Sequence, residues 1–208
     1  ACDQYTSQPE YWAETDRIVG DAPSTLRLTL PEVYLEEVDV AARTETIHKT
    51  MRRYIEEGTL QTLPAGIILT ERWSGGACPR RGIVLAMDLE AYEYTPGSAS
   101  LIRPTEKTVV ERIPPRLKVR QGACMELPHI MILIDDPDRT IIEPLFEKTA
   151  SFDRIYDTDL MQNGGHITGW FLPNGPETEA IEAKLEALCD RETFNKKYGC
   201  TDAQALLP

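Results

Sequence analysis

The stretch from Ser100 to Ala123 carries six basic and two acidic side chains, a local net charge of +4 in a chain whose net charge is −12. Guanidinium groups bind phosphates and carboxylates through paired N–H donors, so this reversal of charge indicates a site for a small anionic ligand. The charged residues are Arg103, Glu106, Lys107, Glu111, Arg112, Arg116, Lys118 and Arg120.

Two prolines within this stretch predict a helix that positions its arginines. Pro114 and Pro115 favour a helix start, because a first-turn proline loses no intrahelical hydrogen bond. Arg116 and Arg120 then lie four residues apart on one helix face, where like charges repel unless an anion or a carboxylate lies between them. Two interpretations stay open: a phosphate or carboxylate site, or a solvated or salt-bridged helix.

The stretch resembles the signature of a bacterial and archaeal family catalogued as domain of unknown function 1015. Its members carry a Glu-x-Thr element, a downstream arginine and an apolar strand that ends in acidic residues. The matching residues here are Glu106 to Thr108, then Arg112, Arg116 and Arg120, then residues 129–137. Thr105 stands where many members have a histidine. The opening ACDQYTSQPEYW and the later GGHITGWFLPNG are also similar, so the resemblance spans nearly the whole chain, and the family's activity is largely undefined.

The two ends of the chain suggest a piece of a longer protein. Ala1 to Asp3 read as the end of a strand, and the last residues, AQALLP, begin a new apolar segment. The resemblance implies a further strand and an Asp-Gly-His/Asn-His-type motif after Pro208, similar to one in the ParB/sulfiredoxin-like nucleotide-binding fold. We therefore expect an exposed sheet edge through which two copies could form a homodimer.

The first functional hypothesis is an enzyme, a nucleotide-dependent phosphotransferase (kinase-like) that acts on a small hydroxylated metabolite. ATP or another phosphate donor, together with Mg²⁺, would be its cofactor. Glu106 would act as the catalytic base or orient the acceptor hydroxyl. Arg112, Arg116 and Arg120 would hold the phosphates and neutralise developing charge, while Thr105 and Thr108 would donate hydrogen bonds.

The second hypothesis is a non-catalytic anion- or nucleotide-binding or regulatory module that uses the same residues. A third interpretation needs no ligand, because the basic stretch could be an ion-pair network that organises the domain. Asp3, Gln4 and Tyr5 are candidates for lining the pocket, since they lie at a predicted strand-to-helix junction, where ligands often bind. Local capping of the helix is the alternative role for these three residues.

Two further groups of charged residues favour structural roles. Asp135 and Asp136 could hold Mg²⁺ at a strand end, but the sequence DDPD is more typical of a turn than of a metal site. Arg80 and Arg81 follow Gly75 and Gly76, which favours a hairpin tip over an anion-binding loop because no GK[ST] follows. No metal site is predicted, because the five cysteines include no CxxC pair.

Composition limits the class of protein. No apolar run approaches the roughly 20 residues of a membrane span, and no signal peptide is visible, so we expect a cytoplasmic protein without a membrane partner. The net charge of −12 argues against binding to nucleic acid. The prolines and glycines are dispersed at element boundaries, which favours one compact domain spanning residues 1–208.

Periodicity predicts a mixed α/β fold, a mixed sheet with hairpins and some non-local strand pairing, flanked by three to four helices. Ser7 is the predicted N-cap of the first helix, and Pro31 the predicted start of a short helical turn. Predicted helices cover 9–19, 39–57, 141–148 and 176–190, besides the one that starts at Pro114 and a short one that leads to Gly199. Predicted strands cover 66–73, 82–92, 129–135, 152–160 and 166–172, and residues 26–30 are predicted to be a strand or an extended piece.

Overall fold

The computed structural model describes residues 5–35, 39–93, 95, 100–103, 109–127 and 129–199, apart from the side chain of Arg112. The chain divides into two compact units, and each is described by itself. The first unit combines Ala1–Thr62 with Lys107–Met131, and the second combines Leu63–Glu106 with Ile132–Pro208. The expected single domain stays a prediction, since it concerns how these units are arranged.

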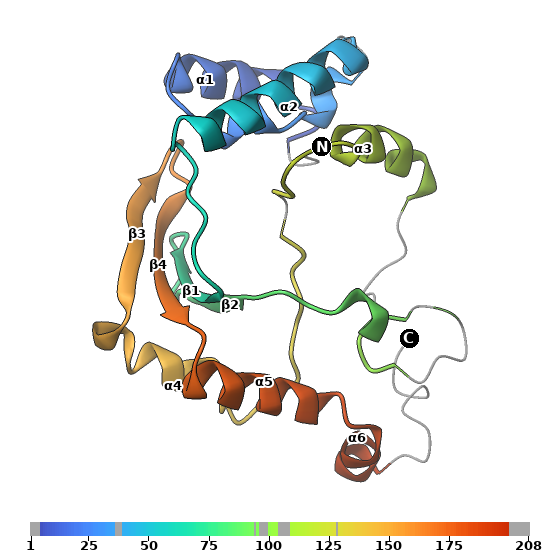
Figure 1. The fold of residues 1–208 in the computed structure, drawn as a ribbon, viewed down its shortest axis with the longest axis vertical. Coiled ribbons are helices and arrows are strands. Elements are labelled where there is room, and N and C mark those ends of the chain that lie inside the picture. Colours follow the sequence, from blue (N-terminus) through green and yellow to red (C-terminus); the bar gives the residue numbers. More distant parts are fainter. Residues whose placement is uncertain are drawn as a thin grey trace. The chain divides into compact units, whose positions relative to one another are not determined.

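The first unit is helical, with α1 (Pro9–Val19), α2 (Val40–Glu56) and α3 (Ile113–Arg120) (Figure 1). Local signals explain the boundaries of α1 and α2. Gly20 ends α1 with a φ of 52°, and the Asp39 carboxylate begins α2 by accepting hydrogen bonds from the Ala41 and Ala42 amides. The predicted N-cap of α1 is wrong by one residue: Gln8 occupies that position instead of Ser7, and its side chain makes no cap.

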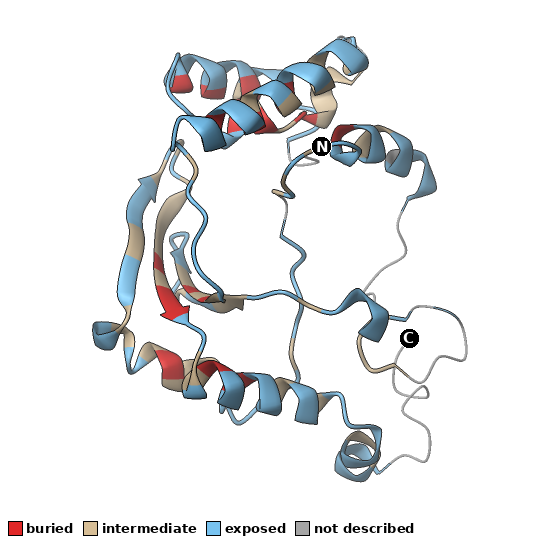
Figure 2. Ribbon diagram, viewed as in Figure 1, coloured by how far each residue is buried: buried red, intermediate tan, exposed pale blue. Residues whose placement is uncertain are grey.

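A strand or extended piece is predicted at residues 26–30, but Thr25–Leu28 form a 3₁₀ turn and the backbone is extended only from Thr29. The Ser24 hydroxyl accepts a hydrogen bond from the Leu26 amide and so favours the turn over an extended backbone. A second 3₁₀ turn, Glu32–Tyr34, follows Pro31 as predicted. The alternate leucines are nevertheless buried, and Figure 2 shows buried segments on the inner sides of these helices. The main core of this unit is Leu28, Leu30, Ile47, Met51, Tyr54 and Val119.

In the second unit, the residues that the structure describes form four strands: β1 (Gly66–Trp73), β2 (Arg80–Val84), β3 (Asp153–Leu160) and β4 (Gly165–Pro173). Their order is β2-β1-β4-β3 and every pair is antiparallel. Both predicted hairpins are present, and the β1–β4 pair supplies the non-local pairing. The strand predicted over 82–92 ends at Val84, and a 3₁₀ turn, Leu89–Ala91, follows it.

The described residues of this unit also form three helices: α4 (Glu143–Phe146), α5 (Pro176–Leu188) and α6 (Arg191–Tyr198). One face of the sheet packs on α4 and α5. Ile67 and Leu69 on this face are paired with Leu172 and Trp170 in the next strand. The second core therefore joins sheet and helices, and the predicted mixed α/β class is confirmed. Its buried members are Ile67, Leu69, Ile141, Leu145, Leu172 and Ile181.

The predicted buried strand at 129–135 is wrong. Residues 129–136 lie outside any strand, and Ile130 and Leu133 are 77% and 75% exposed. Hydrophobic residues make a strand only when another strand accepts their backbone hydrogen bonds. In the described part of the chain, this segment has no strand beside it. The apolar run therefore has the β propensity of a strand but lacks the hydrogen bonds to a neighbouring strand.

Candidate functional site

Arg116 is held by a carboxylate from the start of the chain. Its Nε and Nη2 atoms donate to Oε1 of Glu32 at 3.1 and 2.9 Å. The side chain of Glu32 is only 10% exposed and that of Arg116 27%. Breaking a partly buried pair leaves a charge without its partner, which costs more than the pair itself contributes. Arg116 therefore anchors α3 to the turn that contains Glu32.

Arg120, one turn further along α3, is held more loosely. Its Nε lies 3.1 Å from Oε1 of Glu126, and the two side chains are 47% and 55% exposed. Exposed pairs contribute at most about 1 kcal/mol, so an incoming anion could replace the carboxylate at small cost. The hollow beside Arg120 has a volume of about 20 Å³, which is room for one water molecule.

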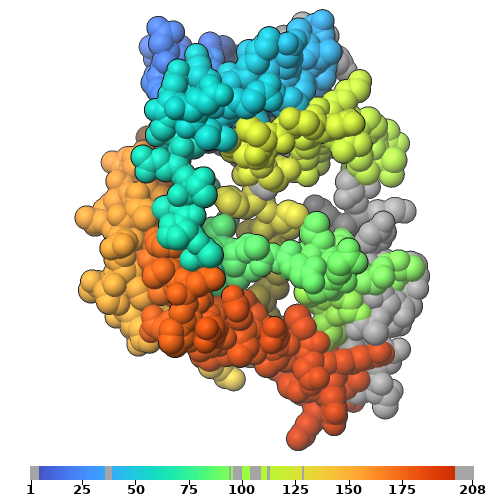
Figure 3. Space-filling model, viewed as in Figure 1, coloured from blue at the N-terminus to red at the C-terminus, as the bar shows by residue number. Residues whose placement is uncertain are grey.

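A histidine fixes the position of α3 on α2. The Nε2 atom of His48 donates to the Val119 carbonyl oxygen at 2.7 Å. Val119 itself is buried among Ile47, Met51 and Tyr54. Figure 3 shows the yellow-green atoms of α3 lying against those of α2. The arginines are therefore carried by a helix with a defined place in its unit. His48 therefore links the two helices by a hydrogen bond.

Most of the other predicted site residues lie outside the described part of the chain. Thr105, Glu106, Thr108, Asp3 and Gln4 belong there, as does the side chain of Arg112. Their convergence with Arg116 and Arg120 stays a prediction. Tyr5 is described: its carbonyl oxygen accepts a hydrogen bond from the Trp12 indole at 3.3 Å and its ring stacks on Tyr11. These contacts give Tyr5 a role in holding the start of α1.

The aspartates at 135 and 136 form the predicted turn. Asp136 accepts hydrogen bonds from the Ile141 amide at 2.8 Å and the Thr140 hydroxyl at 3.1 Å. The Asp135 carboxylate accepts from Tyr198 and Lys197 and so ties α6 to this turn. These hydrogen bonds hold the pKa of Asp135 below its usual value, with Tyr198 the largest cause.

Arg81, one of the two arginines at the first hairpin, also has structural partners. Arg81 pairs with Glu71 across the β1–β2 ladder at 2.8 Å, and its guanidinium lies 4.7 Å from the ring centre of Phe146. This cation–π contact favours the predicted hairpin over an anion-binding loop. In the part of the chain that is described, no three acidic, histidine or cysteine side chains converge in a way that could hold a metal ion.

Sequence reasoning missed a charged cluster on β3 and β4, at the same end of the sheet as the tip of the first hairpin. His166 lies between Asp159 and Asp157, with Nδ1 to Oδ1 of Asp159 at 2.7 Å and Nε2 to Oδ1 of Asp157 at 2.6 Å. Asp157 also pairs with Arg154 at 2.7 Å, and the neighbour of His166 on β1 is Trp73. The predicted hairpin of residues 152–172 could have revealed this cluster. Asp157 and Asp159 alternate in one strand, so their side chains lie on the same face as His166 near the start of the partner strand.

This cluster makes stability depend on pH. The hydrogen bond to Asp159, and next that to Asp157, raises the pKa of His166 above its usual 6.5. The imidazolium therefore stabilises the hairpin fully below pH 6.5, and the contribution is lost as the pH rises through the higher folded pKa. We expect the urea midpoint of the wild type to exceed that of His166→Gln at pH 6, with the difference shrinking by pH 8.5. A difference independent of pH would contradict this assignment.

The described residues define an α/β protein with a four-stranded antiparallel sheet and a basic helix, α3, on a separate helical unit. The chain belongs to the family described as "Protein of unknown function (DUF1015)", whose model matches residues 1–191 of the 208. This match confirms the resemblance. Searches of curated proteins and of solved structures found no match. Among the described residues, no helix is both long and apolar enough to cross a bilayer.

Proposed function

We propose that the chain binds a small phosphate-bearing ligand at the basic face of α3, as part of nucleotide-dependent phosphoryl transfer to a small hydroxylated metabolite. The observation that carries the proposal is the contrast between two arginines one helical turn apart. Arg116 is fixed by the sheltered Glu32, while Arg120 holds Glu126 in an exposed pair. The first sets the position of the helix, and the second can exchange its carboxylate for a phosphate.

The charge of α3 supports this proposal. The helix carries Arg116, Lys118 and Arg120 and no acidic residue, in a chain of net charge −12. A phosphate is attracted to this face, and the guanidinium of Arg120 can donate two parallel hydrogen bonds to it. Because the arginine is exposed, we expect the affinity to fall as the salt concentration rises.

In the proposed reaction, the acceptor hydroxyl gives its proton to Glu106 and attacks the terminal phosphorus of the donor nucleotide. The bond between that phosphorus and the bridging oxygen breaks, and a nucleoside diphosphate leaves. Arg120 would neutralise part of the negative charge on the transferred group. Mg²⁺ bound to the nucleotide would supply further neutralisation.

A second candidate function is a non-catalytic module that binds the same ligand. Two observations favour it: both described arginines of α3 have carboxylate partners, and the hollow beside Arg120 holds about one water molecule. Phosphoryl transfer needs a site that holds the acceptor and the donor in line. Neither observation indicates a preformed pocket of that kind.

Turnover distinguishes the two candidates. The assay measures ATP consumption by phosphorus NMR in the presence of Mg²⁺ and each of a panel of small hydroxylated compounds. We expect ATP to be consumed only when one of these compounds, the acceptor, is present. Glu106→Gln should slow this consumption by roughly 10²- to 10⁴-fold, the usual contribution of a general base, without changing the affinity for ATP. ATP binding without turnover for any acceptor would favour the non-catalytic module. Absence of any phosphate binding would contradict both candidates.

A further inference from the structure

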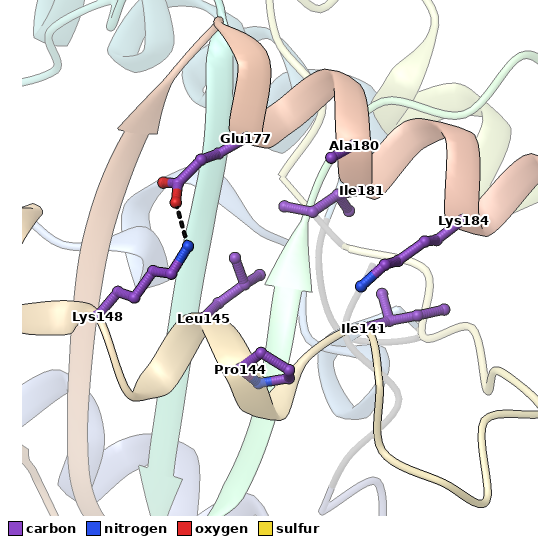
Figure 4. A pocket seen from close by; sticks show the side chains of 8 residues that line it. All are labelled: Ile141, Pro144, Leu145, Lys148, Glu177, Ala180, Ile181 and Lys184. Carbon is purple, nitrogen blue, oxygen red and sulfur yellow. Dashed lines mark hydrogen bonds and ion pairs between the residues drawn. The ribbon is translucent and has the colours of Figure 1, made fainter.

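A small cavity of about 110 Å³ opens between α4 and α5 in the second unit. Its floor consists of Ile141, Leu145 and Ile181, which are buried members of the core under the sheet. Figure 4 shows Leu145 and Ile181 pointing toward each other in the space between the two helices. Because core residues form the floor, the cavity is part of the folded unit rather than an opening in a loop.

Two lysines stand on opposite sides of this apolar floor (Figure 4). On one side the Nζ atom of Lys148 pairs with Glu177 at 2.5 Å. On the other side Lys184 donates to the carbonyl oxygen of Thr140 at 2.7 Å. The lining carries two ammonium groups and one carboxylate, so its net charge is positive in an acidic chain.

Lys184 is the group that could bind an anionic head. Its ammonium has three N–H donors, and the bond to the neutral Thr140 carbonyl uses one of them. A bond to a carboxylate would be stronger than that one, because both partners carry charge. Asp136, a carboxylate near Lys184, already accepts from Ile141 and Thr140 at the edge of the cavity. The Asp136 charge offsets part of the attraction of Lys184 for an external carboxylate, and the N–H donors that Thr140 does not use remain for that ligand.

The volume restricts the ligand. Drug-sized ligands and nucleotides need pockets of roughly 300–1,000 Å³, so this cavity cannot enclose a nucleotide. A cavity of about 150 Å³ holds a benzene molecule, so 110 Å³ has room for about four or five carbon atoms. The lining therefore fits a molecule with a short apolar body and a single negative charge.

We propose that this cavity binds a short-chain aliphatic carboxylate, with its hydrocarbon on Leu145 and Ile181 and its carboxylate on Lys184. This site uses residues of the second unit alone and is independent of the proposed phosphate site on α3. Isovalerate is a suitable probe because its branched chain has four carbon atoms beyond the carboxylate carbon. Isopentylamine has the same branched chain with a cationic head and is the matched control ligand.

Methyl NMR on the full chain tests this proposal. We expect isovalerate to give saturable shifts of the Leu145 and Ile181 methyl signals with a dissociation constant in the millimolar range. Isopentylamine at the same ionic strength should give none, because its ammonium would face Lys184. Lys184→Gln should weaken isovalerate binding about tenfold, as loss of one charge-assisted bond predicts. Lys184→Arg should retain most of it.

A second variant tests the cavity itself. Ala180 is an exposed residue of α5 that lines the mouth, so Ala180→Leu should cover the cavity without disturbing the core. We expect this change to abolish saturable binding, whereas Ala187→Leu, at an exposed position of the same helix away from the cavity, should leave it unchanged. Shifts that do not saturate, equal responses to the amine, or binding that survives Ala180→Leu would each overturn the proposal.

Discussion

Replacing Gly165 with alanine is expected to destabilise the second unit by about 3 kcal/mol or more. Gly165 opens β4 with a φ of 89°, a conformation that residues with a Cβ rarely adopt. A Cβ there would lie 1.8 Å from the Trp73 carbonyl oxygen and 2.9 Å from the Cα of Ser74. Both contacts are to backbone, so no side-chain rotation can relieve them.

Gly82→Ala is the matched control for this substitution. A Cβ at Gly82 would meet only the Thr70 methyl carbon, at 3.7 Å, which is ordinary van der Waals contact. We expect the control to be as stable as the wild type or slightly more so, because alanine lowers the entropy of the unfolded chain. Urea unfolding followed by tryptophan fluorescence measures both variants. Similar midpoints for Gly165→Ala and the wild type would show that β4 starts elsewhere.

Replacing Glu32 with alanine is expected to lower the free energy of unfolding by about 2 kcal/mol, because it removes the partner of a half-buried guanidinium. Arg116 reaches 84 residues back along the chain to this carboxylate, so the pair joins α3 to the first half of the unit. The matched variant, Glu126→Ala, removes the partner of the exposed Arg120 and should cost less than about 0.5 kcal/mol.

Unfolding of both glutamate variants in denaturant gives this comparison. The expected order is wild type, then Glu126→Ala close below it, then Glu32→Ala well below both. Adding Arg116→Met to Glu32→Ala should restore part of the loss, because the half-buried charge that Glu32 neutralised is then removed as well. Equal losses for the two glutamates would contradict the separation of the arginines into one that anchors α3 and one that can exchange its partner.

Elements with local signals could be predicted from the sequence. Proline at the start and glycine at the end placed α1, and apolar residues at helical spacing with Gly58 at the end placed α2 within one residue of its observed bounds. The turn residues at 163–165 located the second hairpin correctly. These signals act over a few residues, so tertiary contacts do not override them.

Features that depend on distant partners could not be predicted. The apolar run at 129–135 has the composition of a strand, but a strand requires a neighbour that composition does not reveal. The segment around Leu26 alternates as a strand does, but the Ser24 cap turns it into a 3₁₀ helix. The sequence shows that α3 is basic. It does not show that Arg116 pairs with Glu32 and Arg120 with Glu126, because these partners are brought together only by the fold.

The most direct test of the proposed phosphate site is a calorimetric titration of the full chain with pyrophosphate at low salt. We expect Arg120→Gln to weaken binding about tenfold, the loss of one charge-assisted hydrogen bond. Glu126→Gln should tighten it, because the competing carboxylate loses its charge. Arg17→Gln, which alters an exposed arginine paired with Glu14 on α1, should leave the affinity unchanged. Equal affinities for the wild type, Arg120→Gln and Glu126→Gln would contradict the assignment of phosphate binding to α3.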